Sequence, residues 1–170
     1  GAGINCVGVS AAGGLVRFPS VGDISGDWGG GASLGMEALF LAVRAEDGRG
    51  QVTALREAIM QHFGRASVAE ITAALHFHEI PRSRLHELVP VLLRVAEAGD
   101  GPAAAVVQRQ AEEVFLLARA ALERLGLRPG DRIATLAMNH DRHLIAWFGV
   151  VGMGGVLHTL NLRLAPEEIG

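Results

Sequence analysis

Two glycine-rich stretches hold the residues of this sequence that are best suited to chemistry. The first, Gly1-Ala2-Gly3, precedes an apolar run, and the second, Gly26 to Gly31, carries Asp27 among its glycines. Glycine has no Cβ, so backbone amides in such a turn can cradle a phosphate, and a carboxylate held there can accept hydrogen bonds from sugar hydroxyls. An ordinary hairpin turn accounts for the first stretch about as well, and a surface turn is the alternative for the second.

Length and composition limit the function further. A chain of 170 residues allows one medium domain or one and a half, and its net charge of -3 gives no reason to expect nucleic acid as a partner. The single cysteine, Cys6, cannot form an internal disulfide, and no leader precedes it, so we expect a cytoplasmic protein. The apolar run Leu144 to Leu160 is interrupted by glycines and is shorter than the roughly 20 residues of a spanning helix, so no membrane span is expected.

Apolar spacing predicts the elements that must position the glycine stretches. We expect a β-hairpin from two strands, Ile4 to Val9 and Leu15 to Phe18. Three helices should follow, at 34–42, 55–63 and 67–75. Thr53 is the expected cap of the second helix, and Ser67 with Glu70 forms a capping box at the start of the third. The stripe from Leu85 to Val95 predicts a further helix, in which Pro90 either causes a kink or occupies the first turn.

A long amphipathic helix is expected from Ala103 to Leu125, with Gly126 as a left-handed cap. After it, the pattern predicts a βαβ unit from a strand at 133–137, a helix at 143–151 and a strand at 156–160.

Histidines offer a second kind of candidate site. His140, Asp141 and His143 have the spacing of two metal ligands on a helix, but no third ligand is evident, so we favour a helix start and predict no metal site. The remaining candidates, His76 and His78 together with His62 and His86, are expected on a solvated surface.

Several motifs before residue 127 occur in the order typical of one known family. They are Gly1-Ala2-Gly3-Ile4-Asn5-Cys6-Val7-Gly8-Val9, Arg17-Phe18-Pro19, Ile24-Ser25-Gly26-Asp27-Trp28-Gly29-Gly30-Gly31 and Leu34-Gly35. This part resembles the BadF/BadG-type ATPases, a family of actin-like ATPases that includes bacterial N-acetylglucosamine kinases. The resemblance implies the second lobe of a two-lobed, ribonuclease-H-like sugar kinase.

The resemblance also implies roles for individual residues. Gly1, Ala2, Gly3 and Asn5 would bind the phosphates of ATP with Mg²⁺, and Gly26 with Asp27 would contact the sugar. Ala2 stands where many members carry a Thr, so that hydroxyl contact is absent. The family's proton-accepting Asp is expected before Gly1 and its adenosine loop after the long helix, so no catalytic residue is assigned here and Asp27 is not expected to replace that base.

The residues from 128 onward resemble a different family. Arg128-Pro129-Gly130-Asp131-Arg132-Ile133, Gly152-Met153-Gly154 and Leu157-His158-Thr159-Leu160-Asn161 are similar to an early, noncatalytic segment of the fatty-acyl-CoA synthetases, which are AMP-forming ligases of the adenylate-forming family. The motifs that carry adenylation would lie beyond Gly170, so no catalytic residue of this family is assigned either.

The two resemblances predict an α/β chain made of two partial domains. Residues 1–127 would form part of a ribonuclease-H-like lobe with a helical insertion, and residues 128–170 would add the βαβ unit, with the strand from Ile133 extending the sheet of the first part. We expect a fragment of an ATP-dependent sugar kinase that is inactive alone and has the helical region as a candidate homodimer contact. The alternatives are a fragment of a long-chain fatty-acyl-CoA ligase and a noncatalytic chimeric scaffold.

Overall fold

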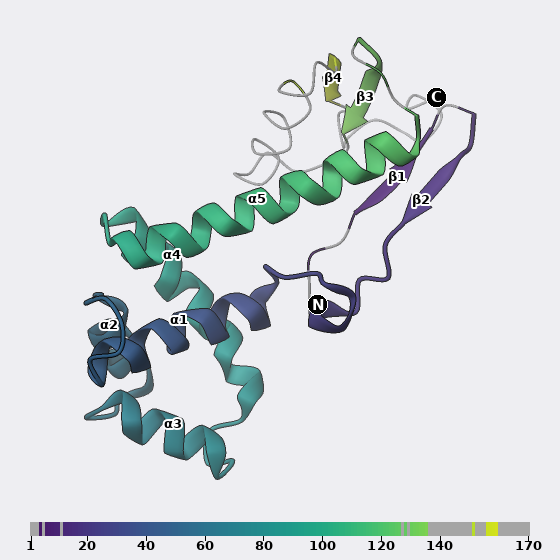
Figure 1. Cartoon of the computed structure of the whole chain (residues 1–170). Helices are drawn as coiled ribbons and strands as arrows, with labels where there is room; N and C mark the ends of the chain where they lie inside the picture. The colour runs from purple at the N-terminus through teal and green to yellow at the C-terminus, as the bar shows by residue number, and fades with distance from the viewer. Residues whose placement is uncertain are drawn as a thin grey trace. The chain divides into compact units, whose positions relative to one another are not determined.

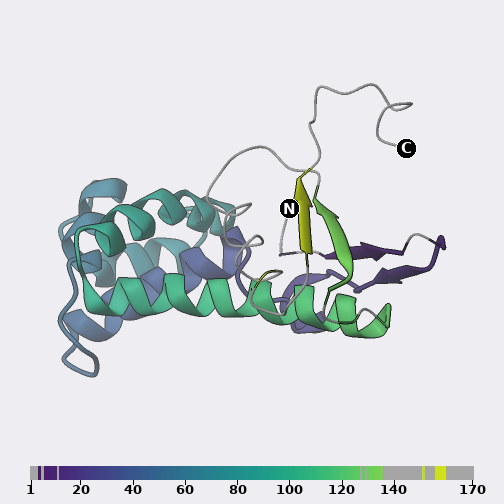
Figure 2. The ribbon, with the colours of Figure 1, turned by 90° about the horizontal axis from the view of Figure 1, so that it is seen from above.

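The computed structural model describes residues 4, 6–10, 12–126, 128, 130–135, 151 and 156–159. They form an α/β protein that is mostly helical, as expected, with two small sheets. The chain divides into two units, residues 1–4 with 20–110 and residues 5–19 with 111–170. The long helix α5, Gly101–Arg124, contributes to both units and is continuous in Figures 1 and 2.

The first unit is a helical cluster around one apolar core. A short 3₁₀ helix, η1 (Gly22–Ser25), precedes α1 (Gly31–Glu46), which is followed by α2 (Leu55–Phe63), α3 (Val68–His76), a 3₁₀ segment η2 (Arg82–Leu88) and α4 (Val89–Glu97). The largest fully buried side chains come from each helix of this cluster from α1 to α4: Leu34, Leu55, Ile59, Val68, Ile71, Leu88 and Leu92. The helices at 34–42, 55–63 and 67–75 are therefore confirmed.

Polar side chains tie the helix ends of this unit together. Ser67 caps α3 by accepting a hydrogen bond from Glu70 N at 3.1 Å, as the capping-box pattern predicts. The carboxylate of Glu46, at the end of α1, accepts hydrogen bonds of 2.9 Å from both Val68 N and Ala69 N. Because the first amides of a helix have no partner within the helix, Glu46 fixes the start of α3 against the end of α1.

Asp100 performs the same task for α2 and α5. Its Oδ1 accepts hydrogen bonds from Thr53 Oγ1 at 2.8 Å and Ala103 N at 2.9 Å, and its Oδ2 accepts one from Ala54 N at 2.8 Å. Burial raises the pKa of this carboxyl, but the three donors outweigh that effect and hold the pKa below its ordinary value. The long helix consequently starts at Gly101, with Pro102 in its first turn, slightly before the predicted start.

Pro90 occupies the first turn of a helix, which settles the two alternatives left by the sequence. The segment predicted as one helix is divided into η2 and α4, and Pro90 lies in the first turn of α4. The N–H that proline lacks would have no hydrogen-bond partner within the helix at this position. The 3₁₀ geometry of η2 is a finding that the apolar spacing does not predict.

The second unit contains both sheets. Strands β1 (Val7–Val9) and β2 (Leu15–Arg17) form the expected antiparallel hairpin, with Gly8 opposite Val16. Strands β3 (Arg132–Thr135) and β4 (Val156–Thr159) pair in parallel, as a βαβ unit requires. The predicted helix at 143–151 falls almost entirely outside the described residues.

The expected continuous sheet is wrong for the described strands. β1 pairs with β2, and β3 pairs with β4, in two separate two-stranded sheets. The hairpin instead meets helix α5 so closely that a Cβ on Gly8 would lie 2.8 Å from Leu125 Cδ1. The left-handed cap at Gly126 is confirmed, with φ of 72°. Among the described helices, none has both the length and the apolar character needed to cross a membrane.

Candidate functional site

The glycine stretch from Gly26 to Gly31 forms a turn that leads into α1. Gly26 and Gly29 both have positive φ, 75° and 113°, which explains why glycine stands at these two positions. Gly30 caps α1 through its backbone, without a side-chain cap. The local sequence thus forces the chain to turn sharply and start a helix immediately beyond Asp27.

Asp27 lies inside this turn and is only 4% exposed. Its backbone N donates to Gly22 O at 3.1 Å, and its Oδ2 accepts a hydrogen bond from Ser25 Oγ. Ser25 Oγ in turn accepts a hydrogen bond of 2.9 Å from Val21 N. The carboxylate is therefore held in one orientation by the turn itself, and it is largely buried.

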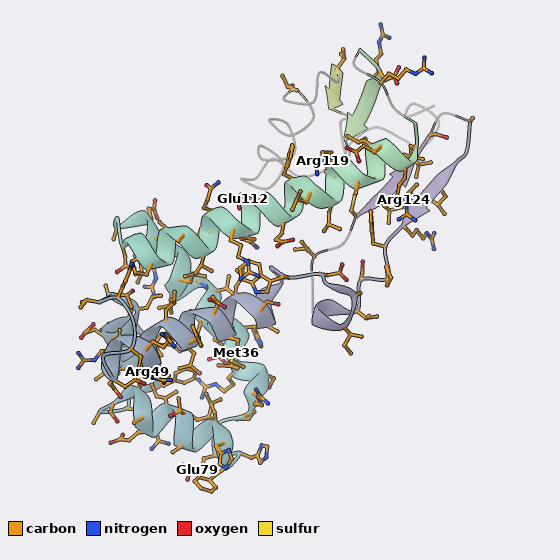
Figure 3. All side chains as sticks on the ribbon, viewed as in Figure 1. Met36, Arg49, Glu79, Glu112, Arg119 and Arg124 are labelled. Carbon is orange, nitrogen blue, oxygen red and sulfur yellow. The ribbon has the colours of Figure 1, made fainter. Side chains whose placement is uncertain are left out.

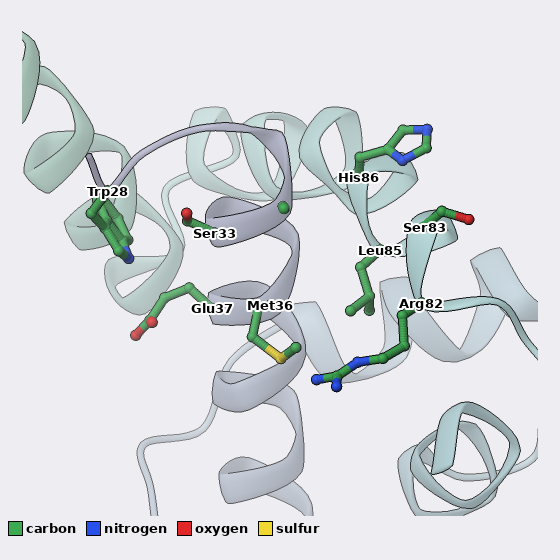
Figure 4. Close-up of a pocket in the computed structure, with 9 residues that line it drawn as sticks. Trp28, Ser33, Met36, Glu37, Arg82, Ser83, Leu85 and His86 are labelled. Atoms are coloured by element: carbon green, nitrogen blue, oxygen red, sulfur yellow. The ribbon is translucent and has the colours of Figure 1, made fainter. Parts of the chain in front are cut away.

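A groove of 620 Å³ lies next to this turn, between the start of α1 and η2 (Figure 4). Gly26 and Asp27 are not among its described lining residues, whereas the next residue, Trp28, is. The polar groups of the lining come from both elements and are Ser33 and Glu37 on α1 with Arg82, Ser83 and His86 on η2. Its volume is in the usual range for small-molecule pockets, about 300–1,000 Å³.

Two side chains of helix α5 contact the turn and hold it in place. Arg109 places its guanidinium carbon 3.9 Å from the centroid of the Trp28 ring, and Gln110 Nε2 donates to Gly29 O at 2.8 Å. A cation over an indole face is an attractive contact, so Trp28 is fixed in place while it lines the groove. These anchoring residues could not be found from the sequence, because they lie about eighty residues away from the turn.

Two features position η2, which supplies the opposite wall of the groove. Gly35 lets α1 approach it, since a Cβ there would lie 2.6 Å from the carbonyl carbon of Leu85. Glu87 joins η2 to α2 by bonding to Arg84 at 2.9 Å and to His62 at 3.1 Å. The hydrogen bonds from Arg84, and then from His62, lower the pKa of Glu87 to about 2, so its carboxylate stays ionised.

Other predicted site residues lie outside the described part of the chain. These are the phosphate-binding candidates Gly1, Ala2, Gly3 and Asn5, and the cluster of His140, Asp141 and His143. The structure therefore brings the sugar-contact candidate Asp27 next to a groove but does not test the predicted ATP contacts. Cys6 is described, and partial burial raises the pKa of its thiol, which disfavours a nucleophilic role.

Comparison with known proteins finds two resemblances in one chain. Residues 108–170 match the AMP-binding enzyme family. A long-chain-fatty-acid–CoA ligase from Thermus thermophilus is 57% identical over 60 residues, which are 34% of this chain and 11% of the ligase. A medium-chain-fatty-acid–CoA ligase from Ectopseudomonas oleovorans is 49% identical over 61 residues, with the same two shares.

The second resemblance is weaker in identity and wider in coverage. An N-acetylmuramic acid/N-acetylglucosamine kinase from Clostridium acetobutylicum is 26% identical over 161 residues, which are 95% of this chain and 47% of the kinase. The chain therefore spans about a tenth of each ligase and slightly less than half of the kinase. Both predicted resemblances are confirmed, whereas the domain boundary at residue 127 stays a prediction.

Proposed function

We propose that this chain supplies the sugar-recognising part of an ATP-dependent amino-sugar kinase, which transfers a phosphoryl group from ATP to a sugar hydroxyl. The observation that carries this proposal is the ordered turn that holds Asp27 beside the Trp28 groove, in a chain whose similarity to a named amino-sugar kinase extends over 95% of its length. None of the chain's described residues is assigned the role of proton acceptor in this proposal.

The chemistry of the groove supports a sugar as its ligand. An aromatic face can cover the C–H groups of a pyranose ring, while hydroxyl, carboxylate and guanidinium groups can bond to its hydroxyls and to an acetamido group. Trp28 supplies the first kind of contact, and Ser33, Glu37 and Arg82 supply the second. Asp27 would act by fixing a ligand hydroxyl rather than by taking its proton.

ATP and Mg²⁺ belong to the proposal only through the resemblance. The residues predicted to hold the phosphates are Gly1, Ala2, Gly3 and Asn5, which the structure does not describe. Among the residues that it does describe, no three His, Cys, Asp or Glu side chains gather where they could hold a metal ion. We therefore derive no step of phosphoryl transfer from this chain.

Calorimetric titration with N-acetylglucosamine, with and without Mg-ATP, tests the proposal. We expect saturable binding that is lost in Asp27→Ala and weakened in Trp28→Leu, while substitution of the exposed Glu97 by Ala leaves it unchanged. Thermal unfolding of each variant separates loss of the site from loss of the fold. Absence of sugar binding in a well-folded, unaltered chain would contradict the proposal and favour a noncatalytic scaffold.

The second candidate is a fragment of a fatty-acyl-CoA ligase. The observation that favours it is the identity of 57% over 60 residues, in a region where β3 and β4 form a parallel pair. Fatty-acid-dependent exchange of pyrophosphate into ATP would report acyl adenylation directly. We expect none from this chain, and a positive result would replace the kinase proposal by the ligase one.

A homodimer through the helical region also stays a proposal, which sedimentation can test.

A further inference from the structure

A second groove, of 420 Å³, runs between α1, α3 and η2 in the same unit as the first. Its floor is formed by Leu39, Leu75 and Leu85, which are only 6%, 8% and 5% exposed. Met36 borders it with a side chain that is 39% exposed and is visible on α1 in Figure 3. The groove is therefore apolar at its base and open to solvent above.

The rim of this groove carries basic side chains. His76 and His78 border it at the end of α3, and Arg82 borders it at the start of η2. No carboxylate is among its described lining residues, and the acidic neighbour Glu79 is directed to Arg65, at 3.6 Å. Within the described part of the chain, Arg82 has no ion-pair partner. The groove thus combines an apolar floor with an uncompensated basic rim.

His78 has a backbone conformation that its residue type disfavours. Its φ is 62°, in the left-handed region, and it follows the end of α3 where Ile80 N bonds back to Ala74 O at 3.0 Å. Glycine is the usual residue at this position after a helix, because it has no Cβ. A residue with a Cβ at this position carries backbone strain that glycine would relieve, and the residue here is one that borders the groove with an imidazole.

From this arrangement we infer that the second groove binds a small alkyl carboxylate, with its anionic head at the basic rim and its tail on the leucine floor. Arg82 can bond to a carboxylate through two parallel N–H groups, and the two imidazoles can donate further hydrogen bonds. The alkyl tail gains by leaving water for the contact with Leu39, Leu75 and Leu85. Met36, Arg82 and Leu85 border both grooves, whereas Leu39, Leu75, His76 and His78 border only the second. The inference does not rest on the kinase proposal, because these four residues belong to the second groove alone.

Octanoate is a suitable probe, because it has one carboxylate and a tail of moderate length. We expect it to bind the full chain in a calorimetric titration without ATP, whereas acetate and the uncharged octanamide bind at least tenfold more weakly. Arg82→Gln should weaken octanoate about tenfold, the loss of one charge-assisted contact, while Arg94→Gln on α4 should not change it. Binding without ATP also distinguishes this site from acyl adenylation.

His78→Gly is the sharpest variant, since its two expected effects have opposite signs. The protein should unfold at a higher temperature, because glycine relieves the backbone strain, and yet octanoate should bind about tenfold more weakly. A purely structural histidine would give the first effect without the second. The inference is overturned if octanoate does not bind, if octanamide binds equally well, or if His78→Gly leaves octanoate affinity unchanged.

Discussion

The close approach of α1 to η2 makes Gly35 a position where a larger residue should disturb the packing of these two elements. An alanine Cβ at this site would lie 2.6 Å from the Leu85 carbonyl carbon and closer still to its oxygen, although real Cβ contacts are essentially never shorter than 3.0 Å. The obstacle is backbone, so no side chain can swing aside. The two elements must instead separate by roughly 1 Å, which forfeits a quarter to a half of the dispersion energy of the atoms along the contact.

The expected cost of Gly35→Ala follows from two opposing contributions. Overpacking of this kind costs about 1–3 kcal/mol, and the rigid backbone obstacle places Gly35 at the upper end of that range. Alanine regains about 1 kcal/mol through its higher helix propensity. We therefore expect Gly35→Ala to lower the free energy of unfolding by about 2 kcal/mol.

Urea denaturation followed by far-ultraviolet circular dichroism measures this change. Gly31→Ala is the matched control, because it lies on the same helix and its Cβ would meet His86 Cβ at an ordinary 3.5 Å. That control should be neutral or slightly stabilising. Equal stability of the two variants would refute the reasoning, since it would mean that α1 and η2 are not in the close contact described.

Three further predictions concern the polar contacts at the helix ends. Asp100→Ala should lose about 1–3 kcal/mol of unfolding free energy at neutral pH. Because the folded pKa of Asp100 is below its ordinary 3.8, this contribution should begin to decrease as the pH falls through 3.8 and be lost below the folded pKa, so the difference between the urea midpoints of the two proteins should be smaller at pH 3 than at pH 7. Ser67→Ala should cost about 1 kcal/mol by removing the cap of α3, while Ser67→Asp should preserve most of the stability in the same assay. The folded pKa of Glu87 is about 2, so its carboxylate should stabilise the protein above its ordinary pKa of 4.5 and lose that effect as the pH falls from 4.5 to about 2. The stability of Glu87→Gln should therefore depend less on pH between these two values than that of the unaltered protein, as acid unfolding would show.

Local patterns predicted the elements of this chain better than the groove between them. The hairpin, the Ser67 cap and the left-handed Gly126 each depend on residues close in the sequence, and each is confirmed. The isolated Gly35 within an apolar helix could have indicated a close packing contact. Its partner Leu85 could not be identified, because fifty residues separate them and no local rule selects the pair.

The same limit explains what the sequence missed at the candidate site. Asp27 could be singled out because a carboxylate among glycines is a local signal, but its burial and its bond to Ser25 depend on how the turn folds. His78 is exposed, as expected, but only the backbone conformation reveals that it occupies a position suited to glycine. Arg82 gave no local signal, since it becomes part of a groove only when η2 packs against α1.

Helix α5 shows that the two resemblances do not divide the chain into two separate structural parts. The match to the AMP-binding enzymes begins at Gln108, yet α5 continues without interruption from Gly101 to Arg124. Arg109 and Gln110, which lie inside that match, hold Trp28 and Gly29 of the kinase-like turn. A kinase-like part that ended at residue 107 would lose both contacts, whereas one that ended at residue 127 would keep them together with the whole helix. The glycine turn therefore depends on two residues of α5 that also lie within the match to the AMP-binding enzymes, and the boundary at residue 127 stays a prediction.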